Sequence, residues 1–220
     1  RALTAFNDTQ DAEVKNKPMI RYKEGLSQNT IWVNESLGID PATGDEIFLD
    51  LDGNKVNEWS TANYKPLGST DPKVYGTIGT MFVYKKWELN AHMYYKYGGY
   101  LYNSTLVDKI ENVNPNENGD KRILYDRWNA PGDIAKFKKV SDVSVTNPTS
   151  RFVEKENYIQ LQSLSLSYDF SSDQLRKVGI QRLKVSAIGN DIFKSSTVKM
   201  ERGTSYPYAR TFSLSAQVTF

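Results

Sequence analysis

The residues that could bind a metal ion or transfer protons are few and widely spaced. Asp50–Asn54 (DLDGN) resembles the start of a calcium loop, but an EF-hand needs glycine where Lys55 stands. Asp52-Gly53 is better explained as a hairpin turn. His92 is the only histidine, and without cysteine or a second histidine it cannot form a usual zinc site. No spacing pairs two carboxylates for glycoside hydrolysis. The sequence therefore predicts no catalytic residue, metal site or cofactor.

Composition narrows the classes of function further. The absence of cysteine excludes thiol catalysis and disulfides. With 28 basic and 26 acidic residues, the charge is nearly balanced and gives no reason to expect nucleic-acid binding. The sequence contains no run of about 18 apolar residues, so it predicts no transmembrane helix. The first residue is Arg1 and not Met, so we expect the start to be a cut or processed edge. The many aromatic residues favour strands.

The last eleven residues, Arg210–Phe220, alternate strictly between apolar and polar side chains. This period of two predicts a strand with one apolar face, and the length suits a tilted strand that crosses a bilayer. A core strand of a soluble sandwich would show the same pattern. Outer-membrane assembly machinery reads a terminal aromatic preceded by alternate apolar residues, and the residues in that pattern are Phe212, Leu214, Ala216, Val218 and Phe220.

Four earlier segments, 182–190, 163–170, 89–97 and 73–84, also alternate, although Ile188 falls on the polar face of the first and the pattern blurs around Met81–Tyr84 in the last. Upstream of Gln162, just before the segment 163–170, the alternation changes phase, which predicts a bulge or the exit from the membrane. His92 falls on the polar face of its strand, where we expect a hydrogen-bonding role.

The connections between these strands separate by length. The links 85–87 and 171–181 are short, whereas 101–157 and 192–209 are long. Outer-membrane barrels have short periplasmic turns and long external loops, while a soluble sandwich has no reason to sort its loops in this way. Tyr84, Trp87 and Phe170 fall at the predicted periplasmic ends, where an aromatic girdle belongs. The barrel interpretation is therefore preferred.

The expected fold class is all-β: the carboxy-terminal strands and long extracellular loops of a large transmembrane β-barrel. Residues 1–72 are expected to be an extracellular loop region, 73–100 a transmembrane hairpin, 101–157 an extracellular loop, and 158–220 the last three transmembrane strands. Five strands cannot close a barrel, because the smallest barrels have about eight. We expect an amino-terminal plug domain and further strands outside this chain, and Arg1–Phe6 to be the top of one more strand.

The loop sequences resemble those of SusC/RagA-type TonB-dependent transporters. The stretches that carry the resemblance are Ser36–Glu46, Gly76–Leu89, Gly98–Leu106, Asp126–Asp133, Ser150–Glu154, Asn157–Tyr168 and Tyr206–Phe220. This resemblance implies a plugged barrel of roughly 22 strands in the cell outer membrane. It also implies uptake of oligosaccharides or peptides, driven by TonB through the amino-terminal part, with a SusD-like lipoprotein at the external mouth. The resemblance further implies contact with outer-membrane lipid and no binding to nucleic acid. A soluble all-β glycan-binding module is the alternative.

Exposed aromatic and charged residues in the long loops are candidates for contact with substrate or the lipoprotein. These candidates are Arg127, Trp128, Asp133, Tyr100, Tyr102 and Tyr206. The alternative is that the aromatic residues form small loop cores and that Arg127 and Asp133 form an internal ion pair.

Overall fold

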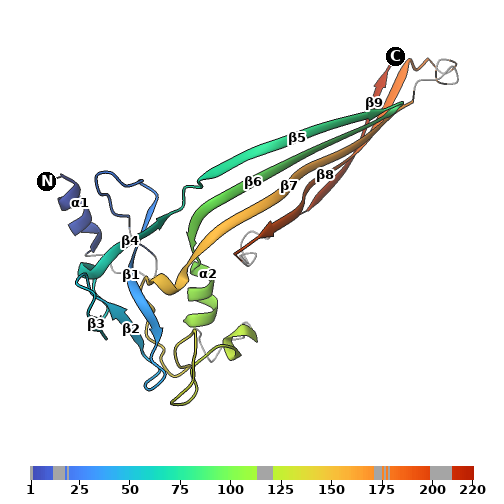
Figure 1. Ribbon diagram of the computed structural model, residues 1–220. Coiled ribbons are helices and arrows are strands. Elements are labelled where there is room, and N and C mark those ends of the chain that lie inside the picture. The colour runs from blue at the N-terminus through green and yellow to red at the C-terminus, as the bar shows by residue number, and fades with distance from the viewer. Residues whose placement is uncertain are drawn as a thin grey trace. The chain divides into compact units, whose positions relative to one another are not determined.

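The computed structural model describes residues 2–11, 18, 20–112, 121–170, 175, 177, 179–198 and 210–220 (Figure 1). Contacts divide the chain into two compact units. The first, here called the loop unit, consists of Arg1–Pro72 and Gly99–Lys155. The second, the strand unit, consists of Lys73–Gly98 and Glu156–Phe220. None of the described helices has the length and apolar character needed to cross a membrane.

The strand unit is built on a five-stranded sheet whose spatial order follows the sequence (Figure 1). Its strands are β5 (Val74–Tyr84), β6 (Trp87–Tyr102), β7 (Val153–Phe170), β8 (Arg182–Ser196) and β9 (Thr211–Thr219). All five predicted strands are confirmed. The observed β6, β7 and β8 extend beyond the alternating segments.

A break in register lies opposite Gln162, close to the point where the alternation of β7 changes phase. Between the pairs Leu161–Phe193 and Ser163–Asn190, the single residue Gln162 of β7 faces two residues of β8, Asp191 and Ile192. The irregularity predicted near Gln162 is therefore present, but the extra residue belongs to β8 and not to β7. The β5–β6 hairpin closes tightly, with Tyr84 paired to Trp87 and Lys85 at a φ of 54°.

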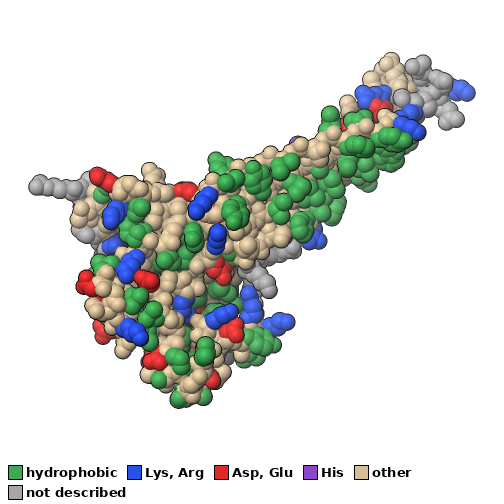
Figure 2. All heavy atoms as spheres, viewed as in Figure 1, with side chains coloured by type: hydrophobic (Ala, Val, Ile, Leu, Met, Phe, Trp, Pro, Cys, Tyr) green, Lys and Arg blue, Asp and Glu red, His purple; other side chains and the backbone are tan. Residues whose placement is uncertain are grey.

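One face of this sheet is apolar. Directly paired residues share a face, and the register pairs Ile78 with Met93 and Ala187 with Leu214. The Trp87 ring lies 4.7 Å from the Tyr168 ring, which places β6 and β7 side chains on that same face. No second sheet covers it among the described residues: Leu214 is 84% exposed. Figure 2 shows hydrophobic side chains gathered along one side of the sheet.

The opposite face is mostly polar and carries its own bonds, with Met81 and Val83 as exposed apolar residues near the hairpin. Lys184 Nζ lies 2.7 Å from Glu88, and the hydroxyls of Ser167 and Ser186 are 2.8 Å apart. His92 is on this face, paired with Gly79, as the alternation predicted. The sheet therefore presents two chemically different surfaces.

The loop unit contains a second, four-stranded antiparallel sheet in the order β3-β2-β1-β4. Its strands are β1 (Thr30–Ile39), β2 (Glu46–Leu49), β3 (Lys55–Val56) and β4 (Tyr64–Ser69). The turn predicted at Asp52-Gly53 joins β2 to β3 and is confirmed. The carboxylate of Asp50 accepts hydrogen bonds from Asn54 and from the backbone of that turn, which lowers the pKa of Asp50.

Short helical segments complete the loop unit. They are α1 (Ala2–Asp11), η1 (Thr61–Asn63), α2 (Ser104–Leu106), η2 (Val107–Glu111), η3 (Lys121–Leu124) and η4 (Ser150–Phe152). The expectation of a strand at Arg1–Phe6 was wrong, because α1 covers residues 2–6. The Phe6 ring stacks on Tyr22 at 5.2 Å, and Asn7 exchanges two hydrogen bonds with the Tyr22 backbone. These contacts with a distant segment favour the helix.

The core of the loop unit lies between its sheet and its helical segments. Its most buried apolar side chains are Val33, Val107, Ile110 and Phe152, each at most 1% exposed. They come from β1, η2 and η4, which are far apart in the sequence. The long loop 101–157 therefore packs against the amino-terminal strands through a shared apolar core.

Candidate ligand and partner site in the loop unit

Arg127 lies inside the loop unit and not on its surface. Its side chain is 5% exposed and donates hydrogen bonds to the carbonyl oxygens of Ile123 at 3.0 Å, Lys138 at 2.7 Å, and Ile110. Burial lowers the pKa of Arg127, and the negative charge of Glu111 opposes that shift. Arg127 therefore ties three loop segments together, and its guanidinium is not presented to a partner.

Trp128 clamps two turns against each other. Its Nε1 donates to the carbonyl of Pro41 at 2.9 Å, and its ring lies so close to Gly44 that a Cβ there would be 2.6 Å away. The backbone N–H of Gly132 donates to the same Pro41 carbonyl at 2.8 Å. The loop-core explanation of Trp128 therefore has direct geometric support.

Asp133 caps its own turn. Its carboxylate accepts hydrogen bonds from the backbone N–H groups of Asn129 at 3.0 Å and Ala130 at 2.9 Å. Neither bond involves Arg127, whose donors go to carbonyl oxygens. The suggested Arg127–Asp133 ion pair is thus replaced by two separate local networks.

The candidate tyrosines also have packing roles. The Tyr100 ring covers Gly68, where a Cβ would lie 2.6 Å from it. The Tyr102 ring meets Phe152 edge-on at 6.2 Å, and burial together with the charge of Glu46 raises the pKa of Tyr102. Tyr206 falls outside the described residues. Among the described candidates, the structure does not gather the aromatic rings into one exposed platform.

The assembly-signal residues lie on the apolar face of the strand unit. Phe212 and Phe220 are 74% and 80% exposed, and Leu214 pairs with Ala187. Their recognition during assembly stays a prediction.

Arg151 is the centre of an ionic network that the sequence did not reveal. Its guanidinium binds both carboxylate oxygens of Glu46 at 2.8 and 2.7 Å, and Glu111 at 2.7 Å. It also donates to the carbonyl of Lys136 at 2.6 Å. Burial disfavours its charge, but the two carboxylates outweigh burial and raise the pKa of Arg151. These partners are 105 and 40 residues away in sequence, so no local motif marks the network.

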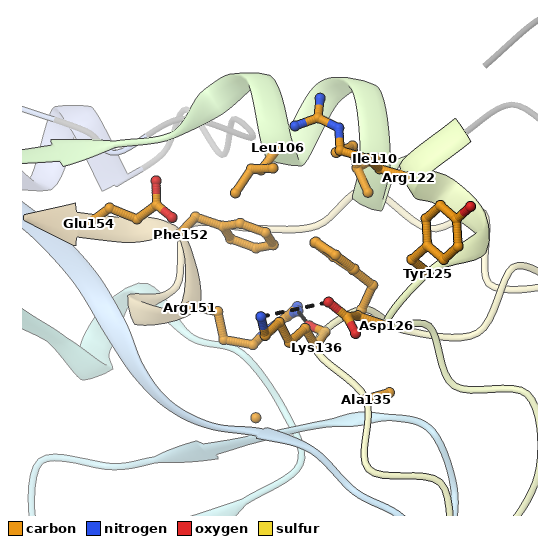
Figure 3. A pocket seen from close by; sticks show the side chains of 12 residues that line it. Leu106, Ile110, Arg122, Tyr125, Asp126, Ala135, Lys136, Arg151, Phe152 and Glu154 are labelled. Carbon is orange, nitrogen blue, oxygen red and sulfur yellow. Dashed lines mark hydrogen bonds and ion pairs between the residues drawn. The ribbon is translucent and has the colours of Figure 1, made fainter. Parts of the chain in front are cut away.

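A cavity of about 550 Å³ opens in the loop unit beside this network (Figure 3). Its apolar lining comes from Leu106, Ile110, Phe137 and Phe152. Tyr125 and five charged side chains also line it, and the charged ones are Arg122, Asp126, Lys136, Arg151 and Glu154. Within the described part of the chain, no three His, Asp or Glu side chains are grouped so that they could hold a metal ion.

Comparison with known proteins gives a consistent result. No family model matches the chain. A protein named TonB-dependent receptor P3, from Formosa agariphila, is 25% identical over 206 residues, covering 84% of this chain and 20% of that receptor. The chain thus spans about a fifth of the length of the curated relative it matches.

Solved structures match over most of the chain. The RagAB peptide importer in its open-open state matches with a TM-score of 0.71 and 18% identity, covering 92% of this chain and 25% of that one. Its closed-closed state matches with a TM-score of 0.69 and 19% identity, with 92% and 26% covered. At these identities the structural likeness shows the fold.

Proposed function

Because the chain is a SusC/RagA-like part of a TonB-dependent receptor, we propose that it serves in nutrient import across the cell outer membrane. In this proposal the strand unit is one sector of a multi-pass β-barrel wall. The complete receptor takes up oligosaccharides or peptides with energy supplied through TonB, and a SusD-like lipoprotein covers its external mouth. The function is transport and binding, without covalent catalysis.

The two-faced sheet of the strand unit is the observation that carries this proposal. Its apolar face includes Ile78 at 58%, Phe212 at 74% and Leu214 at 84% exposure. A contiguous apolar surface of this kind is rare on a soluble monomer, whereas lipid would cover it. The polar face, with its Glu88–Lys184 ion pair, suits the interior of a barrel.

The strand pairing supports the same conclusion. In the sheet as described, β5 and β9 each have one neighbouring strand. A spanning sheet has no open edges, because unpaired backbone groups are costly in hydrocarbon. We infer that further strands of the receptor pair with both edges and close the barrel.

The direct test is made on the full-length receptor in cells. The proposal expects the receptor in the outer-membrane fraction, released only by detergent, and expects nutrient uptake to stop when TonB is deleted. The alternative, a soluble all-β glycan-binding module, expects release without detergent. Release in buffer alone would reject the transporter proposal.

Hydrolysis is the other alternative, and the geometry disfavours it. Glu46 and Glu111 both bind Arg151, which brings two carboxylates together. However, the side chain of Glu111 is 0% exposed and that of Glu46 is 11% exposed. A glycosidase needs one carboxyl group free to donate a proton and both facing the substrate. Here both carboxylates are held by the guanidinium, so we assign them to stability.

A further inference from the structure

The apolar face of the strand unit contains a groove. A cavity of about 570 Å³ lies on this face and is lined by residues of β6, β7, β8 and β9, among them Trp87 and Phe170. A second cavity of about 460 Å³ lies along β7, β8 and β9. The two cavities share Leu166, Ala187 and Leu214, so they form one continuous groove. Each volume is within the usual range of pockets for small ligands.

The groove follows from the sizes of paired residues on β8 and its two neighbours. Ala187 is paired with Leu166 of β7 and with Leu214 of β9, and directly paired residues share a face. A small side chain between two large ones leaves a depression along β8. The depression is bounded near Gly189, where the Ile192 side chain lies 2.8 Å from the position that a Cβ would occupy. Ala187 is therefore the floor of the groove.

The other end of the groove is aromatic. The centroid of the Tyr168 ring lies 4.7 Å from that of Trp87 and 4.5 Å from that of Phe170. This is the end of the sheet where β5 turns into β6 and where β9 ends (Figure 1). Tryptophan and tyrosine favour the headgroup level of a bilayer, because each side chain has an apolar body and a polar tip. In a barrel wall the groove would therefore run from the headgroup level toward the hydrocarbon.

A lysine ammonium lies on the same face at the aromatic end. Tyr84 is paired with Trp87, so both rings belong to the apolar face. Lys85 follows Tyr84 in the hairpin turn, and its Nζ lies over the Tyr84 ring, 5.4 Å from the ring centroid. Lys86, the next residue of the turn, is exposed. An anionic group at this end of the groove would therefore meet a positive charge.

An acyl chain suits this groove better than a protein segment does. In a barrel wall the apolar face meets lipid, and the backbone groups of a docked peptide would lack hydrogen-bond partners there. A chain gains little hydrophobic free energy when it leaves the lipid phase for the groove, since both are apolar. The headgroup must therefore supply the preference. One lysine at the membrane surface favours an anionic lipid by about fivefold, whereas a zwitterionic headgroup offers no net negative charge.

We propose that the groove along β8 is a binding site for one anionic phospholipid. One acyl chain lies over Ala187, the Trp87 and Tyr168 rings flank the glycerol region, and the phosphate lies beside Lys85. This inference rests on the proposed barrel. It adds the position of a single lipid and the charge of its headgroup.

The test is native mass spectrometry of the full-length receptor, delipidated in detergent. Phosphatidylglycerol and phosphatidylethanolamine with identical acyl chains are added in turn. We expect phosphatidylglycerol to be retained about fivefold more strongly or better. Lys85→Gln should remove most of this preference and leave the binding of phosphatidylethanolamine unchanged. The matched control is Lys73→Gln, an exposed lysine beside the opposite end of β5, which should keep the preference.

A second pair of variants locates the acyl chain. Ala187→Phe fills the floor of the groove and should weaken phosphatidylglycerol binding several-fold, because the new ring and the chain compete for the same volume. Ala91→Phe is the matched control, since Ala91 lies on the same face of the sheet, two residues from Met93, and lines neither cavity. It should leave binding unchanged. Heat-modified mobility on gels verifies that each barrel is folded.

The proposal is overturned if the two lipids bind equally, if Lys85→Gln keeps the preference, or if a folded Ala187→Phe receptor binds phosphatidylglycerol as Ala91→Phe does. Should Ala187→Phe fail to fold, Lys85→Gln in the exposed turn still decides the question. Failure here is separate from failure of the import function. A receptor that requires detergent and supports TonB-dependent uptake, yet shows no preference for phosphatidylglycerol, would reject the lipid site alone.

Discussion

Two glycines in the loop unit adopt nearly the same backbone conformation in different surroundings. Gly44 has a φ of 77° and lies under the Trp128 ring, whereas Gly53 has a φ of 85° and open space where a Cβ would be. Both positions disfavour other residues because φ is positive. Only at Gly44 does a side chain also collide with a neighbour. Comparing substitutions at Gly44 and Gly53 therefore distinguishes the effect of backbone strain from the effect of a collision with Trp128.

We expect Gly44→Ala to loosen the loop 126–137 more than Gly53→Ala does. Each variant has backbone strain of about 1 kcal/mol or more, and Gly44→Ala adds an overpacking cost of about 1–3 kcal/mol. Hydrogen exchange of residues 128–132, with the emission of Trp128, would measure the difference. Equal exchange in the two variants would contradict the clamp assigned to Trp128.

Arg151 and Lys139 show how burial changes the stability lost when one partner of an ion pair is removed. Arg151→Met leaves the fully buried Glu111 without its cation, so we expect the loop unit to lose about 3–5 kcal/mol. Lys139→Met breaks an exposed ion pair with Asp45 and should cost only about 0–1 kcal/mol. Hydrogen exchange in η2 and β2 measures both variants. Similar protection in both would show that the Arg151 network contributes no more than a surface pair.

At the scale of elements, substitutions in β9 test which face of the sheet contacts lipid. Leu214 is on the apolar face and Ser213 on the polar face, one residue apart. If Leu214 lies near the bilayer midplane, Leu214→Lys should cost about 2–4 kcal/mol, while Ser213→Lys should cost much less. Urea unfolding of the full-length receptor in lipid vesicles compares them. Equal losses would mean that the two faces do not differ in contact with lipid.

The terminal aromatic of β9 gives a prediction about assembly. Phe220 is 80% exposed, so its deletion removes little packing from the folded sheet. If Phe220 is an assembly signal, the deletion should lower the amount of receptor in the outer membrane while the inserted fraction keeps its heat stability. Phe193→Ala, which removes an aromatic side chain 53% exposed within β8, is the control. Unchanged levels for the deletion would refute the signal.

At the scale of the whole receptor, the proposed contact with a SusD-like lipoprotein can be tested at residues other than Arg127 and Trp128. Arg127 is buried and Trp128 holds an internal turn, so replacing them would disturb the loop itself. The same loop exposes Leu124 at 78% and Ile134 at 95%. Single exposed apolar side chains are common on protein surfaces, and where a partner covers them they act as anchors. We propose that these two side chains contribute to docking of the lipoprotein.

We therefore expect Leu124→Ser combined with Ile134→Ser to reduce co-purification of the lipoprotein several-fold, since apolar anchors contribute much of the affinity at an interface. Leu51→Ser, which changes a leucine 59% exposed in the same unit, should have little effect. The receptor should remain inserted in all cases. Full co-purification with the double variant would exclude this surface.

The strand unit could be predicted from the sequence by itself, because its information is local. A sheet with one face in lipid needs apolar side chains at every second position, and neighbouring strands follow one another along the chain. Leu164–Phe170 and Phe212–Phe220 show that pattern without any knowledge of contacts. The change of phase upstream of Gln162 marked the irregularity, but only the strand pairing shows that the extra residue lies in β8.

The arrangement of the loop unit depends on tertiary contacts and could not be predicted from local sequence patterns. Arg151 meets Glu46 and Glu111 across long stretches of chain, and whether Arg127 is exposed or buried depends on carbonyl groups of three separate segments. Residues 2–6 form a helix whose Phe6 packs on Tyr22, although their sequence also suited the end of a strand. Such contacts have no period in the sequence. They arise because a loop that must bury its own polar groups finds partners wherever folding brings them close.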